Sequence, residues 1–102
     1  MEKQIVLYNL AGQVTEQAYK DYVLNEKGPL LESLSTVNKY ELVKIIQSDS
    51  GKIPYNYVGV VSVSSLMEFG QKDAPSAAFQ GFLKKWQPMV KDVLMLSGFQ
   101  VY

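Results

Sequence analysis

The order of strand-like and helix-like segments is the feature that most restricts how this chain can fold. Apolar and β-branched residues are concentrated in four short runs, at residues 4–8, 37–47, 55–63 and 93–101. Between the first two runs, and again between the last two, apolar residues recur every three or four positions, which predicts helices. The resulting order, β-α-β-β-α-β, predicts an α+β, ferredoxin-like fold. In that fold both helices cover one face of a four-stranded antiparallel sheet.

Local signals place the ends of several of these elements. Thr15 is a candidate N-cap for a first helix of about three turns, which Gly28-Pro29 is expected to end. Pro29 can then open a short second helical turn that carries Leu30, Leu31 and Leu34. The polar residues 48–52 predict the turn of a β-hairpin between the second and third strands. Ser65 and Glu68 match a capping box at the start of the second helical region. Residues 70–73 are expected to interrupt that region before it resumes near Ser76.

The length and composition are those of one globular unit. A chain of 102 residues suffices for one hydrophobic core, so a single domain over residues 1–102 is expected. Hydrophobic residues make up 47% of the chain and charged residues 20%, which argues against disorder.

The predicted strands are apolar on both faces, although two helices can cover only one face of the sheet. In the run 37–47, one face carries Val37, Val43 and Ile45, and the other carries Tyr40, Leu42 and Ile46. We therefore expect a second copy to pack on the uncovered face, which gives a homodimer with a barrel-like core. The alternative is a monomer in which the helix at 79–90 and the terminal segment wrap further round the sheet.

The residues that are absent exclude several kinds of chemistry. All ten basic residues are lysines, and the chain has no arginine, histidine or cysteine. These absences exclude a disulfide, a thiolate nucleophile, a nitrogen–sulfur zinc site and a Ser-His-Asp triad. No phosphate-binding glycine spacing occurs. We therefore expect no metal and no cofactor, and the sequence identifies no catalytic residue.

Charge and hydropathy restrict the partners and the location. The ten acidic residues balance the ten lysines, so the zero net charge gives no field that would attract nucleic acid. No apolar run approaches the roughly 20 residues of a membrane span, and none resembles a signal peptide. A soluble, cytoplasmic protein without nucleic-acid or membrane partners is expected.

Aromatic and amide side chains inside the apolar segments are the candidate ligand-binding groups. They are Asn9, Tyr22, Asn38, Tyr40, Tyr55, Tyr57 and Trp86. Such rings can stack on a planar aromatic ligand, while hydroxyl, indole and amide groups orient its polar substituents. Each tyrosine can equally be a packing residue with its ring inside and its hydroxyl at the rim. Glu26 lies near a helix C-terminus, which its charge does not complement, and is expected to be solvated.

The sequence resembles the REDY-like family typified by HapK from about Tyr8 to Val101. The most specific shared features are Tyr55 and Tyr57 followed by Phe69-Gly70. Many relatives carry an acidic and aromatic tetrad before the proline of the first helix, and only Glu26 of that tetrad is retained here. The resemblance implies a dimeric α/β barrel with a part in the bipyrrole branch of a prodigiosin-type pigment pathway.

Three functional hypotheses follow from the residues and the resemblance. The leading one is a small secondary-metabolite biosynthesis protein that binds an aromatic or pyrrolic intermediate in a pocket between the sheet and the helices. The second is a non-catalytic interaction module that docks on a larger biosynthetic enzyme. The third is a cofactor-independent monooxygenase, because related barrels place Tyr, Trp and Asn around an aromatic substrate.

Overall fold

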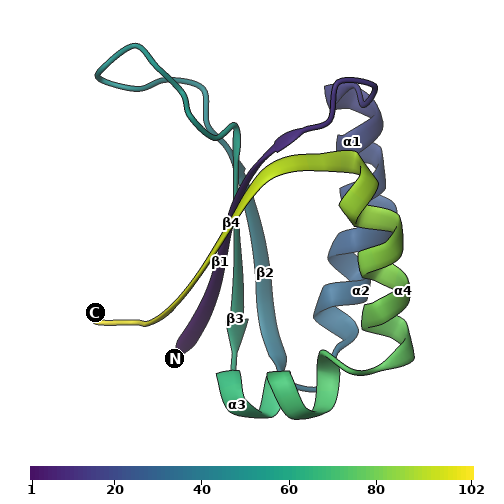
Figure 1. The fold of residues 1–102 in the computed structure, drawn as a ribbon. Helices are drawn as coiled ribbons and strands as arrows, with labels where there is room; N and C mark the ends of the chain where they lie inside the picture. Colours follow the sequence, from purple (N-terminus) through teal and green to yellow (C-terminus); the bar gives the residue numbers. More distant parts are fainter.

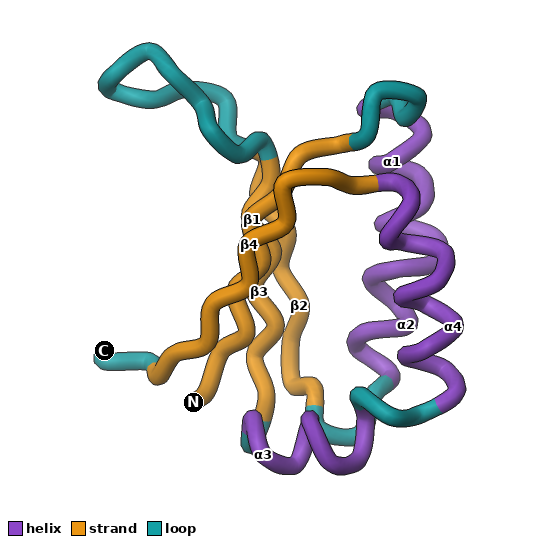
Figure 2. The backbone as a smooth tube through the Cα atoms, in the orientation of Figure 1, coloured by secondary structure: helices purple, strands orange, loops and turns teal.

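The computed structural model describes residues 1–102 and has the predicted order of elements. Its four strands are β1 (Glu2–Leu10), β2 (Val37–Lys44), β3 (Tyr57–Val63) and β4 (Val90–Phe99). They form one antiparallel sheet in the order β2-β3-β1-β4. The longer helices lie on one face of this sheet, and the short helical segment that follows β3 lies below the end of the sheet (Figures 1 and 2). The predicted α+β, ferredoxin-like arrangement is therefore confirmed.

The first helical segment is longer than the sequence predicts. It consists of α1 (Glu16–Tyr22), a π-helical turn (Val23–Lys27) and α2 (Gly28–Ser33), which follow one another without a break. The expected N-cap is confirmed, because the Thr15 hydroxyl accepts a hydrogen bond from the Ala18 N–H at 3.1 Å.

The prediction that Gly28-Pro29 ends the first helix is wrong, and the π-helical turn is the reason. The N–H of Gly28 donates to the carbonyl of Val23 five residues earlier, so the chain stays helical. Pro29 then lies in the first turn of α2, which confirms the predicted helical turn that begins at this residue. A Cβ atom on residue 28 would lie 3.0 Å from the Val23 carbonyl oxygen, so this close turn favours glycine.

The second helical region begins as predicted, and its interruption comes slightly later than expected. It contains α3 (Leu66–Glu68), a π-helical turn (Phe69–Asp73), α4 (Ala77–Trp86) and a 3-10 turn (Gln87–Met89). The Ser65 hydroxyl accepts from the Glu68 N–H, which confirms the predicted cap, and the Ser76 hydroxyl caps α4 in the same way by accepting from the Phe79 N–H. Residues 70–73 belong to the π-helical turn, and the break lies at residues 74–76, after which the helix resumes at Ser76 as expected. None of the helices is both long and apolar enough to cross a membrane.

Two buried clusters fill the space between the sheet and the helices. One consists of aromatic residues at the α1 end of the sheet: Tyr8, Tyr19, Tyr22, Tyr57 and Trp86. The other is mainly aliphatic and lies beside α2: Leu31, Leu34, Val37, Val61 and Val63. The aromatic cluster therefore lies where the sheet, α1 and α4 meet, and it builds the candidate site.

A β-bulge changes which face of the sheet Val37 occupies. Val37 pairs with Val63, whereas Lys39 pairs with the adjacent Ser62, so β2 has one extra residue at this point. The bulge puts Val37 on the helix side, where it is 8% exposed. The prediction that Val37 shares a face with Val43 is wrong for this reason.

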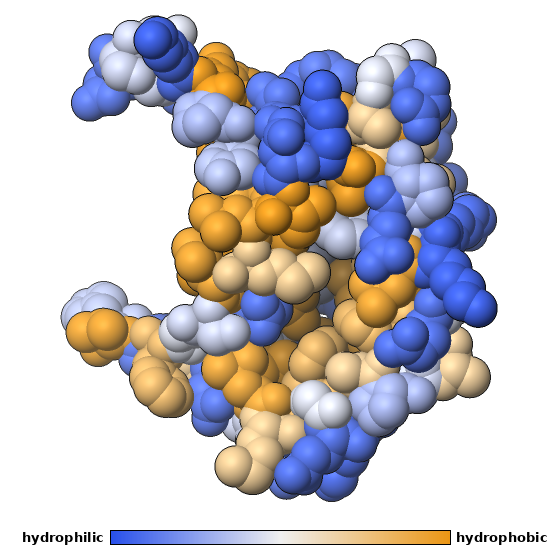
Figure 3. Space-filling model, viewed as in Figure 1, coloured by the Kyte–Doolittle hydropathy of each residue, from blue (hydrophilic) through white to orange (hydrophobic).

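The sheet face opposite the helices remains uncovered and is largely apolar, with Glu41 on its β2 edge. Strand register and alternation place seven apolar residues on it, and we call them the bare face: Ile5, Leu7, Val43, Val58, Val60, Leu94 and Leu96. Val43, Leu94 and Leu96 are 53%, 40% and 46% exposed. Hydrophobic atoms are visible on this side between the projecting loop 45–56 and the C-terminal segment (Figure 3). These two projections give the bare face a trough-like shape.

Candidate active site around a buried lysine

The π-helical turn between α1 and α2 turns Lys27 toward the interior. A regular α-helix advances about 100° per residue, so Glu26, seven residues after Tyr19, would face the core with it. The π-helical turn adds about one residue to the turn and moves that position to Lys27. Lys27 is 4% exposed, whereas Glu26 is exposed and forms an ion pair with Lys85 of α4.

Four aromatic rings surround the ammonium group of Lys27. Its Nζ lies 4.9 Å from the ring centroid of Tyr8, 5.7 Å from Tyr19, 5.3 Å from Tyr40 and 4.8 Å from Trp86. These distances are within the range of cation–π attraction. Because the four rings come from β1, α1, β2 and α4, only the folded chain assembles this aromatic cage.

A hydrogen-bond network connects the members of the aromatic cage. Lys27 Nζ donates to the Tyr8 hydroxyl at 3.0 Å and to the Tyr19 hydroxyl at 3.1 Å. The two hydroxyl oxygens are 2.6 Å apart, and the Trp86 indole N–H donates to Tyr19 at 2.9 Å. The Tyr40 hydroxyl is buried and has no hydrogen-bond partner. A buried polar atom without a partner is uncommon and marks a position where a ligand group could bind.

Burial changes the acidity of these groups. It lowers the pKa of Lys27 from 10.5 to about 7, because the charged ammonium loses its hydration. It raises the pKa of Tyr19 to about 12, and it raises the pKa values of Tyr8 and Tyr40 above their ordinary range. At neutral pH the tyrosines are therefore neutral, whereas the lysine is present in both its charged and neutral forms.

An inner cavity of about 220 Å³ lies beside Lys27, between the sheet and the helices. Its sheet side includes Val6, Gly59 and Val61, and its helix side includes Phe79 and Phe82 of α4. Apart from Trp86, the lining side chains with nitrogen donors are Lys27 and Gln4. No carboxylate lines the cavity. Apolar walls with a few converging polar groups are typical of small-molecule sites.

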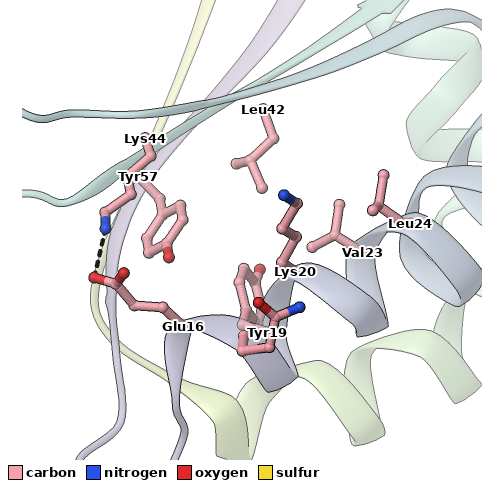
Figure 4. Close-up of a pocket in the computed structure, with 9 residues that line it drawn as sticks. Glu16, Tyr19, Lys20, Val23, Leu24, Leu42, Lys44 and Tyr57 are labelled. Atoms are coloured by element: carbon pink, nitrogen blue, oxygen red, sulfur yellow. Dashed lines mark ion pairs between the residues drawn. The ribbon is translucent and has the colours of Figure 1, made fainter.

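A second, more open groove lies on the other side of the Tyr19 ring, between α1 and β2 (Figure 4). It has a volume of about 370 Å³, and the rings of Tyr19 and Tyr57 form part of its wall. The ion pair between Glu16 and Lys44 crosses its rim. The groove lacks a buried cationic group and is open to solvent. The inner cavity is therefore the better candidate for selective binding.

Four of the seven predicted ligand-binding residues belong to, or adjoin, the aromatic cage. Tyr40 and Trp86 line the inner cavity. Tyr57 stacks on Tyr8 at 5.6 Å between ring centroids and lines the open groove. Tyr22 packs on the outer side of Tyr19 at 5.9 Å and lines neither the inner cavity nor the groove.

The structure places the remaining three predicted residues away from the inner cavity. Asn9 holds the loop 45–56, because its amide donates to the Pro54 carbonyl and accepts from the Asn56 N–H. Tyr55 is half-buried in the same loop. Asn38 is the exposed extra residue of the β2 bulge.

Lys27, Tyr8 and Tyr19 are not among the predicted ligand-binding residues, although the site is built on them. Tyr8 and Tyr19 are 0% and 1% exposed and hold the two hydroxyls that contact the lysine amine. The expectation that Glu26 is solvated is confirmed, but regular helical periodicity continued from Tyr19 does not turn Lys27 inward, so the sequence gives no signal for the lysine. The chain has no group of three or more His, Cys, Asp or Glu side chains that could hold a metal ion.

The fold and the site together define a small ferredoxin-like α+β protein with a lysine buried in an aromatic cavity between sheet and helices. The family described as REDY-like protein HapK matches residues 2–101. The chain therefore belongs to the HapK family. A comparison with curated protein sequences gives no match.

Several solved structures share this fold. HapK from Hahella chejuensis has a TM-score of 0.82 at 24% identity, with 99% of this chain and 93% of that chain covered. A DABB family protein with a ferredoxin-like fold from Mesorhizobium loti has a TM-score of 0.78 at 15% identity, with coverage of 99% and 97%. A dimeric ferredoxin-like protein from Thermobifida fusca has a TM-score of 0.75 at 15% identity, with coverage of 97% and 90%. At these identities the structural likeness shows the fold.

Proposed function

We propose that this protein acts in the bipyrrole branch of a prodigiosin-type pigment pathway and binds an aromatic or pyrrolic intermediate in its inner cavity. Membership of the HapK family supports a small protein associated with biosynthesis. The observation that carries the ligand proposal is the cavity beside Lys27, with its aromatic walls and its unpartnered Tyr40 hydroxyl.

The size of the inner cavity fits a compact aromatic ligand. An apolar protein cavity of roughly 150 Å³ accommodates benzene. A volume of about 220 Å³ therefore suits a molecule of one or two small rings. Rings from Tyr8, Phe82 and Trp86 line this volume and can contact a planar ligand at its face or edge.

Two experiments test this function. Deletion of the gene, followed by mass spectrometry of the accumulating intermediates, identifies the pathway and the step. Titration of the purified protein with bipyrrole intermediates should give saturable quenching of Trp86, which is the only tryptophan in the chain. If no bipyrrole quenches Trp86 saturably, the ligand proposal fails and the role of docking on a larger biosynthetic enzyme is favoured instead.

A matched pair of glycine variants controls for stability in the titration. Gly59 lines the cavity, and an added Cβ would meet the Tyr40 ring at 3.6 Å, an ordinary contact distance. Gly59→Ala should therefore fold normally but weaken ligand binding about fivefold, or about 1 kcal/mol, because the methyl group occupies ligand space. Gly81→Ala, on α4 with open space around the added atom, should leave binding unchanged.

The bare face supports a homodimer as the working form. Its apolar side chains are exposed in one chain, and burial of apolar surface stabilises association by roughly 25 cal/mol per Å². Sedimentation equilibrium at micromolar concentration should therefore give twice the chain mass of 11.5 kDa. Leu96→Asp should shift the protein toward the monomer because it puts a charge among the apolar side chains of this face. A wild-type monomer at that concentration would refute the dimer.

A further inference from the structure

The hydrogen bonds inside the aromatic cage leave donors without acceptors. The Tyr19 oxygen accepts from both Trp86 and Lys27, so its two lone pairs are occupied. Its own proton must then be the one shared across the 2.6 Å contact with Tyr8. The Tyr8 oxygen thus accepts from Tyr19 and from Lys27, and its own proton has no acceptor within this network.

Two further donors reach the same cavity. The buried Tyr40 hydroxyl has no hydrogen-bond partner. The ammonium form of Lys27 has three N–H donors, of which two are used by Tyr8 and Tyr19. Even if Tyr40 accepted the free Tyr8 proton after a small movement, its own proton and the third lysine N–H would still lack an acceptor.

When Lys27 is charged, no protein group supplies the missing acceptor or a counterion. The cavity lining contains no Asp or Glu, and its one amide, Gln4, is bonded to the Leu96 carbonyl and the Ser97 hydroxyl. The acidic residue next to the lysine in sequence, Glu26, faces outward to Lys85. A buried cationic donor without an anion is costly, and a ligand anion would remove that cost.

We infer that the inner cavity binds an aromatic carboxylate, whose oxygens accept hydrogen bonds from Lys27, Tyr8 and Tyr40 while its ring lies against the aromatic walls. This inference rests on the proposed function, since it names the chemical class of the ligand in the same cavity. A phosphate group fits less well because it needs more donors than an apolar cavity of this size offers. A neutral carbonyl would satisfy the hydroxyls but would leave the ammonium without a counterion.

The inference gives binding a definite pH dependence. The Lys27 ammonium faces the rings of Tyr8 on β1, Tyr19 on α1, Tyr40 on β2 and Trp86 on α4. The cavity lining that β3 and β4 contribute is apolar: Gly59, Val61 and Met95. Of these only the tyrosines can ionise, and burial raises their pKa values. Lys27 is therefore the group of the site that changes charge near neutral pH, and a bound carboxylate raises its pKa. Affinity should be highest below pH 7 and should fall as the amine loses its proton.

Two probes of the same shape test the inference. Pyrrole-2-carboxylate and pyrrole-2-carboxamide are titrated against the wild-type protein, with Trp86 fluorescence as the signal. At pH 6.5 the acid should bind at least tenfold more tightly than the amide, and at pH 8.5 most of this preference should be lost. Tyr40→Phe should weaken acid binding several-fold, since it removes one donor and keeps the ring.

Lys27→Met and Lys84→Met form the matched pair of variants. Lys27→Met removes the ammonium and should abolish the preference for the acid, whereas Lys84 is exposed on α4 and its replacement should leave the preference intact. Circular dichroism checks that both variants are folded. If Lys27→Met fails to fold, the acid preference of the wild-type protein and its loss at pH 8.5 decide the question.

The remaining outcomes separate this inference from the proposed function. Equal binding of acid and amide, or an acid preference that persists in Lys27→Met, overturns the carboxylate assignment and leaves the aromatic site standing. If a neutral bipyrrole binds but neither probe does, the carboxylate assignment is likewise wrong and the aromatic site still stands. If neither the probes nor any bipyrrole binds, both the inference and the ligand part of the proposed function are wrong.

Discussion

Replacing Lys27 with methionine should remove a rise in stability between pH 7 and pH 9. Burial lowers the pKa of Lys27 from 10.5 to about 7, so in this range the unfolded chain binds a proton that the folded chain releases. The free energy of unfolding then increases with pH, at up to about 1.4 kcal/mol per pH unit. Because the folded lysine is half protonated at pH 7, the expected gain by pH 9 is about 2 kcal/mol. Met keeps the length and apolar character of the side chain and carries no proton.

Urea denaturation at half-unit steps from pH 6.5 to pH 9 measures this effect. Lys27→Met should be more stable than the wild type at pH 7 and should show a nearly flat profile. Lys84→Met, an exposed control, should keep the wild-type rise. The range stops below pH 10 because the raised pKa values of Tyr8 and Tyr19 make the folded state less stable once tyrosines ionise in the unfolded chain. A flat wild-type profile, or an equal rise in Lys27→Met, would refute the assignment of a buried, partly neutral lysine.

Three further substitutions test how the site is held. Gly28→Ala should cost about 1–2 kcal/mol of stability, because its Cβ meets the Val23 carbonyl at 3.0 Å, whereas Gly81→Ala should gain up to about 1 kcal/mol in thermal denaturation. Asp73→Asn should cost about 2–4 kcal/mol at pH 7, since its carboxylate accepts four hydrogen bonds from residues 35 and 36. Burial opposes ionisation of Asp73, but these bonds hold its pKa below the usual value, so the difference from Asn should shrink as the pH falls below 4. Tyr40→Phe should leave stability unchanged or raise it by about 1 kcal/mol in urea, because the lost hydroxyl has no partner; a large loss would show that the hydroxyl is bonded.

The parts of the fold that the sequence determined depend on neighbours in the chain. The caps at Thr15 and Ser65 each bond an N–H three residues later, so residue type and spacing are enough to predict them. The order of the elements follows in the same way from apolar periodicity, and that order allows few topologies. The uncovered apolar face of the sheet could also be anticipated, because a strand with apolar residues on both sides needs two partners.

The candidate site was only partly predictable. Tyr40 and Trp86 line the inner cavity, and their type and position in half-buried segments give a usable signal. Asn9 is also a polar residue in a predicted half-buried segment, yet its amide bonds the loop 45–56 and does not reach the cavity. Which of several similar side chains converge on one volume depends on how the helices lie on the sheet.

Tertiary packing alone decided the position of Lys27. In a regular helix continued from Tyr19, position 26 would face the sheet. The extra residue in the π-helical turn places Lys27 there instead. The bulge in β2 moves Val37 from one face to the other by the same kind of one-residue change. Such an insertion costs little in backbone hydrogen bonds, so the packing of distant side chains determines whether it forms. The sequence determined which elements form and in what order, whereas the contacts between β1, β2, α1 and α4 determined which lysine became buried among aromatic rings.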